Sequence, residues 1–154
     1  MIQRIQSLYL LVAAALVGGA LFVPLAWFAG SAGEYSLHAF ALRAAGGEAV
    51  QSTLYMGLLL AVACVLPLIT VLLFRRRLLQ IRLCAVEVVL LGGGLIMECI
   101  YYFLCQRVFG ELDFRVRIMR PAAVLPLAAL VFVVLAARAI FRDELLVRAA
   151  ERIR

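Results

Sequence analysis

Two glutamates, Glu87 and Glu98, lie in a long apolar segment and are the side chains whose position most suggests chemistry. A charge at the centre of a membrane helix costs roughly 2.5–3.5 kcal/mol on insertion scales, so an intramembrane carboxylate is a functional candidate. Positions 87 and 98 are eleven residues apart, which is about three helical turns, so both side chains share one helix face. The pair is a candidate intramembrane proton or ion site.

Each glutamate also has a structural interpretation. Glu98 has no basic residue near it in sequence, and a protonated Glu98 bonded to Tyr55, or to a carbonyl freed by a proline, is the alternative to a titrating site. Glu87 lies near one end of its apolar segment, where several arginines are available as ion-pair partners: Arg75, Arg76, Arg77, Arg82 and Arg138.

Other catalytic or metal-binding arrangements find no support in the sequence. The four cysteines contain no C-x-x-C pair and are expected to be buried apolar thiols. His38 is the only histidine and has no cysteine or acidic cluster beside it, which argues against a metal site. With few hydroxyls and no G-x-S-x-G motif, a hydrolytic triad has no candidates. We expect no enzyme activity, no catalytic residue, no cofactor and no metal.

The composition indicates which elements position the two glutamates. Of 154 residues, 67% are apolar and 16% are charged, against roughly 45–50% and about 25% in soluble domains. The mean hydropathy of +1.10 favours lipid as the solvent. The sequence therefore predicts an all-α membrane protein, forming one integral membrane domain over residues 1–154.

Four stretches are long enough to cross a hydrocarbon core of about 30 Å, which takes about 20 apolar residues. They cover approximately residues 8–29, 53–74, 83–104 and 122–140, and they predict a bundle of four transmembrane helices. Small residues let membrane helices approach closely. Because small residues recur at 14–19 and at 92–94, we predict that the first and third spans pack against each other.

The distribution of arginine predicts the orientation of the bundle. Short loops rich in basic residues stay in the cytoplasm. With the N-terminus inside, ten arginines fall on the cytoplasmic side and five on the other. Both termini are therefore predicted to be cytoplasmic, and residues 75–82 to form a tight hairpin on the same side.

The outer loops and the C-terminal tail have patterns of their own. Residues 112–118 alternate apolar with charged side chains, the period of a strand, and part of 35–40 is also compatible with an extended chain. These segments predict a small two-stranded cap on the outer side. The tail over 141–154 has acids and bases at helical spacing, with Glu144 four residues before Arg148, and is predicted to be a cytoplasmic helix.

The two ends of the chain and its hairpin have sequences that resemble those of a known family. The opening MIQRIQSLYLL, the hairpin LLQIRLC and the closing RAIFRDELLVRAAERIR resemble an uncharacterised bacterial family of small proteins with four predicted spans. The resemblance implies a protein of the bacterial cytoplasmic (inner) membrane. Its motif residues cluster on the predicted cytoplasmic side: Gln3, Arg4, Gln6, Gln80, Arg82, Arg138, Asp143, Glu144, Arg148 and Arg152.

Two functions remain open. One is a non-enzymatic subunit or assembly factor of a larger bacterial membrane complex, with envelope biogenesis or protein export as candidate processes. The other is a small proton- or ion-coupled transporter that uses Glu98 and Glu87. The expected partners are anionic lipid head groups and either other integral membrane proteins or further copies of this chain, and no DNA. The candidate residues for partner or lipid binding are Arg4, Arg75, Arg76, Arg77, Arg82, Arg148 and Arg152.

Overall fold

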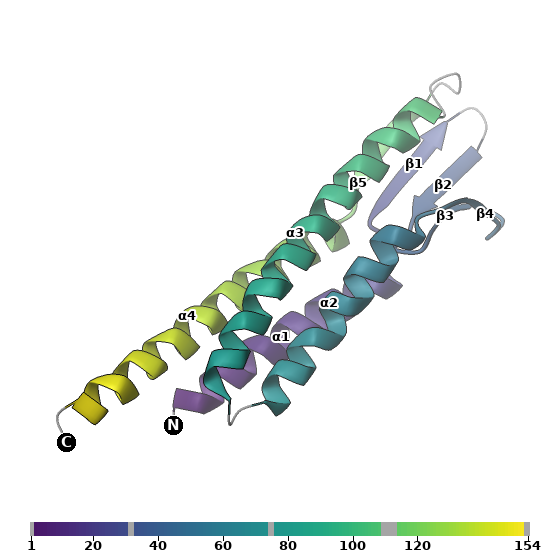
Figure 1. Ribbon diagram of the computed structural model, residues 1–154. Coiled ribbons are helices and arrows are strands. Elements are labelled where there is room, and N and C mark those ends of the chain that lie inside the picture. The colour runs from purple at the N-terminus through teal and green to yellow at the C-terminus, as the bar shows by residue number, and fades with distance from the viewer. Residues whose placement is uncertain (1, 31–32, 74–75, 109–113, 153–154) are drawn as a thin grey trace.

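The computed structural model describes residues 2–30, 33–73, 76–108 and 114–152. They form four long helices and five short strands, with the sheet at one end of the helices and both ends of the described chain at the other (Figure 1). The helices are α1 (Ile2–Phe22), α2 (Leu54–Leu72), α3 (Arg77–Val108) and α4 (Leu125–Arg152), the last preceded by a short 3-10 helix, η1 (Pro121–Val124). The strands are β1 (Ala26–Gly30), β2 (Gly33–Leu37), β3 (Ala41–Ala44), β4 (Ala49–Ser52) and β5 (Phe114–Met119).

All four helices are, by length and composition, long and apolar enough to cross a membrane, as predicted. Large apolar side chains are exposed along each helix, as lipid-facing surfaces require. The α2–α3 connection is short, and the two helices pack against each other as a hairpin. The small antiparallel cap is also present, although it has more strands than predicted.

The buried side of each helix repeats at alternating intervals of three and four residues. This heptad spacing is typical of bundles in which helices cross at a shallow angle with side chains interlocked. The buried positions that follow this spacing include Gln6, Leu10, Ala13, Val17 and Ala20 on α1; Met56, Leu60, Ala63, Pro67 and Thr70 on α2; Gln80, Cys84, Glu87, Leu91, Gly94 and Glu98 on α3; and Ala129, Val133, Ala136, Ile140 and Asp143 on α4.

The helix neighbours differ from the sequence prediction. The main contacts of α1 are with α2 and α4, and those of α3 are with the same two helices, so α1 and α3 lie diagonally opposite. A side chain at Gly18 would meet Sγ of Cys64 on α2, and one at Gly94 would meet Leu60, also on α2. The predicted packing of the first span against the third is therefore wrong, and these glycines serve contacts with α2 instead.

The first helix is shorter than the predicted span over 8–29. It ends at Phe22, two residues before Pro24, because proline disfavours helical geometry in the residue that precedes it. The apolar residues after Pro24 form β1 rather than the last helical turn. Leu25 already takes part in the sheet, since its N–H donates to the carbonyl of Leu37 at 2.7 Å.

The sheet is antiparallel with the order β4-β3-β2-β1-β5. Its inner face packs on the end of α3, where Phe28 and Tyr102 have ring centroids 5.5 Å apart. The expected two-stranded cap is thus a five-stranded sheet in which β1 separates β2 from β5. The alternating segment at 112–118 does contain a strand, β5, although positions 112 and 113 lie outside the described residues.

Candidate functional site

The two glutamates singled out by the sequence both lie inside the bundle. Glu87 is 0% exposed and Glu98 is 3% exposed, and at 1.5 Å per residue about 16 Å of α3 separates them. All four of their carboxylate oxygens are buried without a hydrogen-bond partner in the described part of the chain. An unpaired buried carboxylate is costly, so these two positions are the least satisfied polar sites in the helix core.

The partners expected for these carboxylates are not beside them. Arg76, Arg82 and Arg138 are exposed, and no arginine is among the buried residues that the structure describes. Tyr55 is 74% exposed and is likewise no partner for Glu98. The hydrogen bond expected between Glu98 and Tyr55 is therefore wrong, and Glu87 has no hydrogen bond to Arg76, Arg82 or Arg138; Arg75 and the side chain of Arg77 lie outside the described part of the chain.

Polar side chains close the bundle at the end opposite the sheet. The side-chain amide of Gln6 on α1 donates to the carboxylate of Asp143 on α4. The amide of Gln80 on α3 donates to the carbonyl of Thr70 on α2 at 2.9 Å. Gln6, Gln80 and Asp143 are buried, so these three motif residues hold the helices together at this end of the bundle.

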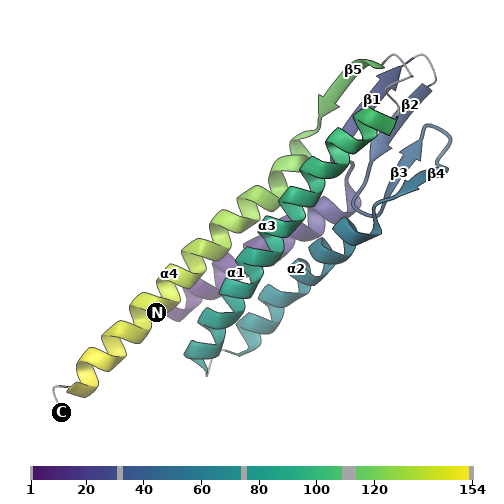
Figure 2. The same ribbon diagram turned by 45° about the horizontal axis from the view of Figure 1, so that its top comes forward.

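The C-terminal part of α4 projects beyond the rest of the bundle (Figures 1 and 2). Because Gln6 and Asp143 are hydrogen-bonded, they lie at the same height along the bundle. From this height α4 continues for nine residues, to Arg152, whereas α1 extends only four residues, to its start at Ile2. At 1.5 Å per residue, the five additional residues make α4 longer than α1 at this end by about 7.5 Å. Residues 141–152 are named here the α4 tail: Asp143 is still buried against α1, and residues 148–152 project past the start of α1.

The α4 tail exposes apolar as well as charged side chains. Leu145 is 51% exposed and Leu146 is 57% exposed, and Arg142 is exposed near them. Of the arginines predicted to bind a partner or lipid, Arg76 and Arg82 are exposed at the same end of the bundle, in the α2–α3 hairpin and the first turns of α3. Arg148 and Arg152 belong to the tail, Arg4 and Arg77 lie near the starts of α1 and α3, and Arg75 lies outside the described residues.

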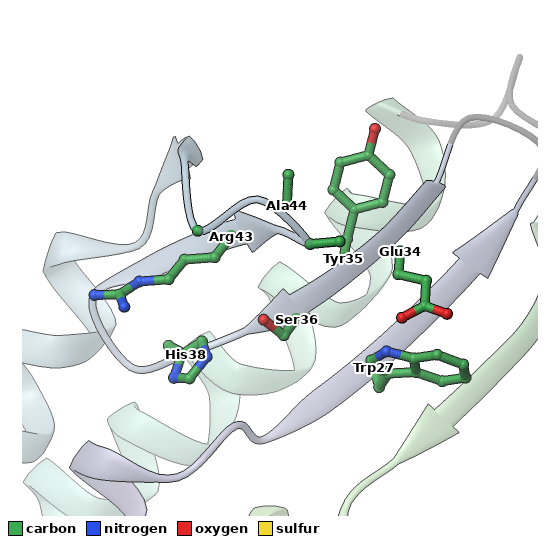
Figure 3. A pocket seen from close by; sticks show the side chains of 9 residues that line it. Trp27, Glu34, Tyr35, Ser36, His38, Arg43 and Ala44 are labelled. Atoms are coloured by element: carbon green, nitrogen blue, oxygen red, sulfur yellow. The ribbon is translucent and has the colours of Figure 1, made fainter.

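At the other end, the outer face of the sheet carries a pocket of about 370 Å³ (Figure 3). Trp27, Ser36 and Arg43 form one row across it, because Trp27 pairs with Ser36 in β1–β2 and Ser36 pairs with Arg43 in β2–β3. Glu34 and His38 lie two residues to either side of Ser36, so their side chains reach the same face. Three neighbouring strands thus bring one aromatic, two ionic and two neutral polar side chains together.

The turn that carries His38 is fixed onto the start of α2. The hydroxyl of Thr53 lies 3.0 Å from the carbonyl oxygens of both His38 and Ala39, and the Thr53 N–H donates to the carbonyl of Phe40 at 3.0 Å. Burial, and then the nearby Arg43 guanidinium, lowers the pKa of His38 below its usual value of 6.5. His38 is therefore neutral at pH 7.

A glycine turn shapes the far rim of the pocket. Gly47 links β3 to β4 with a φ of 84°, a conformation that favours glycine. Its N–H donates to the carbonyl of Ala44 at 2.8 Å. The turn keeps β4 paired with β3, and Gly47 itself lines the pocket.

The sequence did not predict this pocket. Trp27 was expected in the first helix, and no role was predicted for Glu34 or Arg43. Pro24 was the available signal, since a proline followed by an aromatic-rich run is compatible with a helix end and a strand. The described residues contain no group of three or more His, Cys, Asp or Glu side chains that could hold a metal ion. The side chains of the pocket are suited to binding a ligand through charge, hydrogen bonds and aromatic contact.

Comparison with known proteins gives one match. No curated protein and no solved structure matches the chain. A family model described as "Domain of unknown function (DUF4293)" matches residues 2–153. The match covers nearly the whole chain, so the helices, the sheet and both groups of candidate residues fall inside it, and the chain belongs to the uncharacterised DUF4293 family.

Proposed function

We propose that this chain is a non-enzymatic, multi-pass subunit or assembly factor of a larger complex in the bacterial inner membrane. Both termini are assigned to the cytoplasm on the ten-to-five asymmetry of arginine. The α4 tail is the segment that docks on the partner. Envelope biogenesis and protein export are the processes in which we would look for the complex.

The observation that carries this proposal is the exposed apolar surface of the α4 tail, at the end of the bundle where α4 extends past α1. Leu145 and Leu146 are 51% and 57% exposed there. If the tail leaves the bilayer in water, apolar side chains at i and i+4, such as Phe141 and Leu145, form a stripe that fits the groove of another protein.

The distribution of basic side chains also favours this end of the molecule as the docking site. Four arginines are exposed there and none of them is buried in the core: Arg76, Arg82, Arg138 and Arg142. Their charges favour either an acidic protein surface or anionic head groups, each basic residue contributing on the order of 1 kcal/mol near such a membrane. If the tail leaves the bilayer, its leucines favour a protein surface, since head groups do not bury an apolar stripe.

Co-purification from native membranes in mild detergent tests the proposal. Wild-type protein should retain a stoichiometric partner that the Leu145→Ser variant loses at an unchanged level of folded protein. The Val50→Ser variant is the matched control, because Val50 is equally exposed, at 49%, but lies in β4 at the opposite end. Isolation of the wild-type chain as a lone homo-oligomer would reject the docking role of the tail.

The second candidate function is a small proton- or ion-coupled transporter, and one observation favours it. Glu87 and Glu98 are both buried and unpartnered in the helix core, and a binding site for a proton or cation has that character. Ion pairs or hydrogen bonds would have explained their burial, but the expected partners that the structure describes, Tyr55, Arg76, Arg82 and Arg138, are exposed. The four helices of one chain are few for a carrier, so this function requires an oligomer.

Replacement of Glu98 by glutamine separates the two candidates. Glutamine preserves shape and much of the hydrogen-bonding capacity while it removes the titrating group. A transporter should lose transport or growth support at normal protein level, whereas an accessory subunit should be nearly unaffected. Glu87→Gln is the companion variant, and an inactive Glu98→Gln protein that still binds its partners would favour the second candidate.

A further inference from the structure

The pocket on the outer face of the sheet has charges of opposite sign at its two ends (Figure 3). At one end the Glu34 carboxylate lies by the ring of Trp27, and at the other the Arg43 guanidinium points away from Glu34 near His38. Ser36 lies between them. With His38 neutral at pH 7, the five side chains carry one positive and one negative charge. Their complement is a ligand that is itself zwitterionic.

The spacing of the two ends sets the length of such a ligand. Arg43 pairs with Ser36, and Glu34 lies two residues from Ser36 along β2, so the Cα atoms of Glu34 and Arg43 are diagonal neighbours about 8 Å apart. Since their charged groups diverge, the ligand's own charges must be on the order of 10 Å apart. An extended peptide advances about 3.3–3.6 Å per residue, so three or four residues span this distance.

Each end also fits the chemistry of a peptide terminus. A terminal ammonium between the Glu34 carboxylate and the face of Trp27 would gain both an ion pair and a cation–π contact. A terminal carboxylate suits the planar fork of Arg43. Ser36, with a hydroxyl that donates and accepts, suits a peptide group between the two ends. The zwitterionic head group of phosphatidylethanolamine has the same charges, but only two carbons separate its phosphate oxygen from its ammonium, too few for this span.

From this geometry we propose that the outer face of the sheet binds short zwitterionic peptides of three or four residues, with the ammonium at Glu34 and Trp27 and the carboxylate at Arg43. The inference goes beyond the proposed function, because it assigns a ligand to the end of the molecule opposite the α4 tail. It would give the complex a sensor or receptor for peptide fragments.

Trp27 makes the proposal directly measurable, since it is the only tryptophan in the chain. The probe is trialanine, titrated against the full-length protein in detergent while Trp27 fluorescence is recorded, with equilibrium dialysis of labelled trialanine as a second readout. N-acetyl-trialanine and trialanine amide each lack one terminal charge. Both blocked peptides should bind about tenfold more weakly or worse, the loss expected for a charged hydrogen bond.

Matched variants assign each peptide end to its residue. Glu34→Gln should weaken trialanine binding about tenfold and leave the binding of N-acetyl-trialanine unchanged, because that peptide has no ammonium to lose. Arg43→Gln should weaken trialanine and leave trialanine amide unchanged. Arg120→Gln, a change at an exposed arginine after β5 that does not line the pocket, should bind trialanine as the wild type does. Glu34 and Arg43 are both exposed, so these variants are expected to fold, and gel filtration checks this.

Three results would overturn the proposal. The first is that neither readout detects trialanine binding. The second is that trialanine and its blocked forms bind with equal affinity. The third is that Glu34→Gln and Arg43→Gln lose as much affinity for the blocked peptides as for free trialanine. Binding to phosphatidylethanolamine nanodiscs that Glu34→Gln and Arg43→Gln abolish, without trialanine binding, would assign the pocket to a lipid instead. These outcomes leave the proposed function intact, since its test uses co-purification and a variant at the other end of the bundle.

Discussion

Gly57 in α2 provides a sensitive test of how the sheet is seated on the helices. A Cβ atom at this position would lie 2.8 Å from the carbonyl oxygen of Ala39 and would overlap the ring of Phe40. Phe40 is 44% exposed, so its ring is able to turn away. The Ala39 carbonyl belongs to the turn fixed by Thr53, and it does not move without disturbing that turn. Gly57→Ala should therefore displace the 38–40 turn from α2.

The expected magnitude follows from comparison with Gly92 in α3, where a Cβ would meet nothing within 4 Å. Both substitutions gain about 1 kcal/mol of helix propensity, so this gain cancels between them. The remaining difference is the cost of overpacking at position 57, about 1–3 kcal/mol. At about 2–4 °C per kcal/mol for a chain of this size, Gly57→Ala should melt about 2–12 °C below Gly92→Ala.

Thermal unfolding in one detergent, with Trp27 fluorescence as the probe, measures this difference. Trp27 lies in the sheet and therefore reports on the part of the molecule that Gly57 supports. The reasoning is refuted if Gly57→Ala melts at or above the temperature of Gly92→Ala. Gly57→Ser, which adds a still larger side chain, should be at least as damaging as Gly57→Ala.

Three further predictions concern hydrogen bonds and protonation. Thr53→Val should lower the unfolding free energy by about 1–2 kcal/mol, because the carbonyls of His38 and Ala39 lose their hydroxyl donor. Thr53→Ser keeps a hydroxyl and should retain most of the unfolding free energy. Equal melting temperatures for the two variants would contradict this prediction. Gln80→Met should cost about 1 kcal/mol in the same assay through loss of the bond to the Thr70 carbonyl, and an unchanged midpoint would show that this bond contributes nothing. Because the pKa of His38 is lowered in the folded protein, the unfolded state binds its proton more readily, so stability should fall as the pH drops below 6.5 and stay level above it. His38→Gln should remove that part of the pH dependence, and an identical pH profile in the variant would contradict the assignment.

The helical part of the fold could be predicted because its signal is local. Apolar runs of the required length identify a membrane helix without knowledge of its neighbours. The charged and apolar alternation before Pro121 likewise indicates a strand from a few residues. The start of the fourth helical segment at Pro121 follows the ordinary preference of proline for the first turn.

The sheet and its pocket could not be predicted in the same way. The AWFAG segment of β1 is as apolar as the helix before it, so hydropathy alone joins the two. The strands β3 and β4 have four residues each, too short for a clear alternation. The row from Trp27 to Arg43 exists only after three strands have paired in one register, and pairing between strands is not a local property of the chain.

The core-facing side chains of the helices could be predicted in part. The eleven-residue spacing of Glu87 and Glu98 is readable in the sequence, and it predicts that they share one helix face. The partners of buried polar side chains are not readable, since the bond between Gln6 and Asp143 joins positions 137 residues apart. The sequence therefore did not predict that these two motif residues form a buried contact between helices.

Site-specific photo-cross-linking in native membranes tests the docking role of the α4 tail most directly. A photo-reactive residue at Leu145 in the tail should form one discrete adduct with a partner protein, of a mass that differs from that of a second copy of this chain. The same group at Leu127, 49% exposed on the bundle-embedded part of α4, is the matched control and should give no such adduct. Absence of an adduct at Leu145, or the same adduct at both positions, would contradict the account of this protein as a subunit docked through its α4 tail.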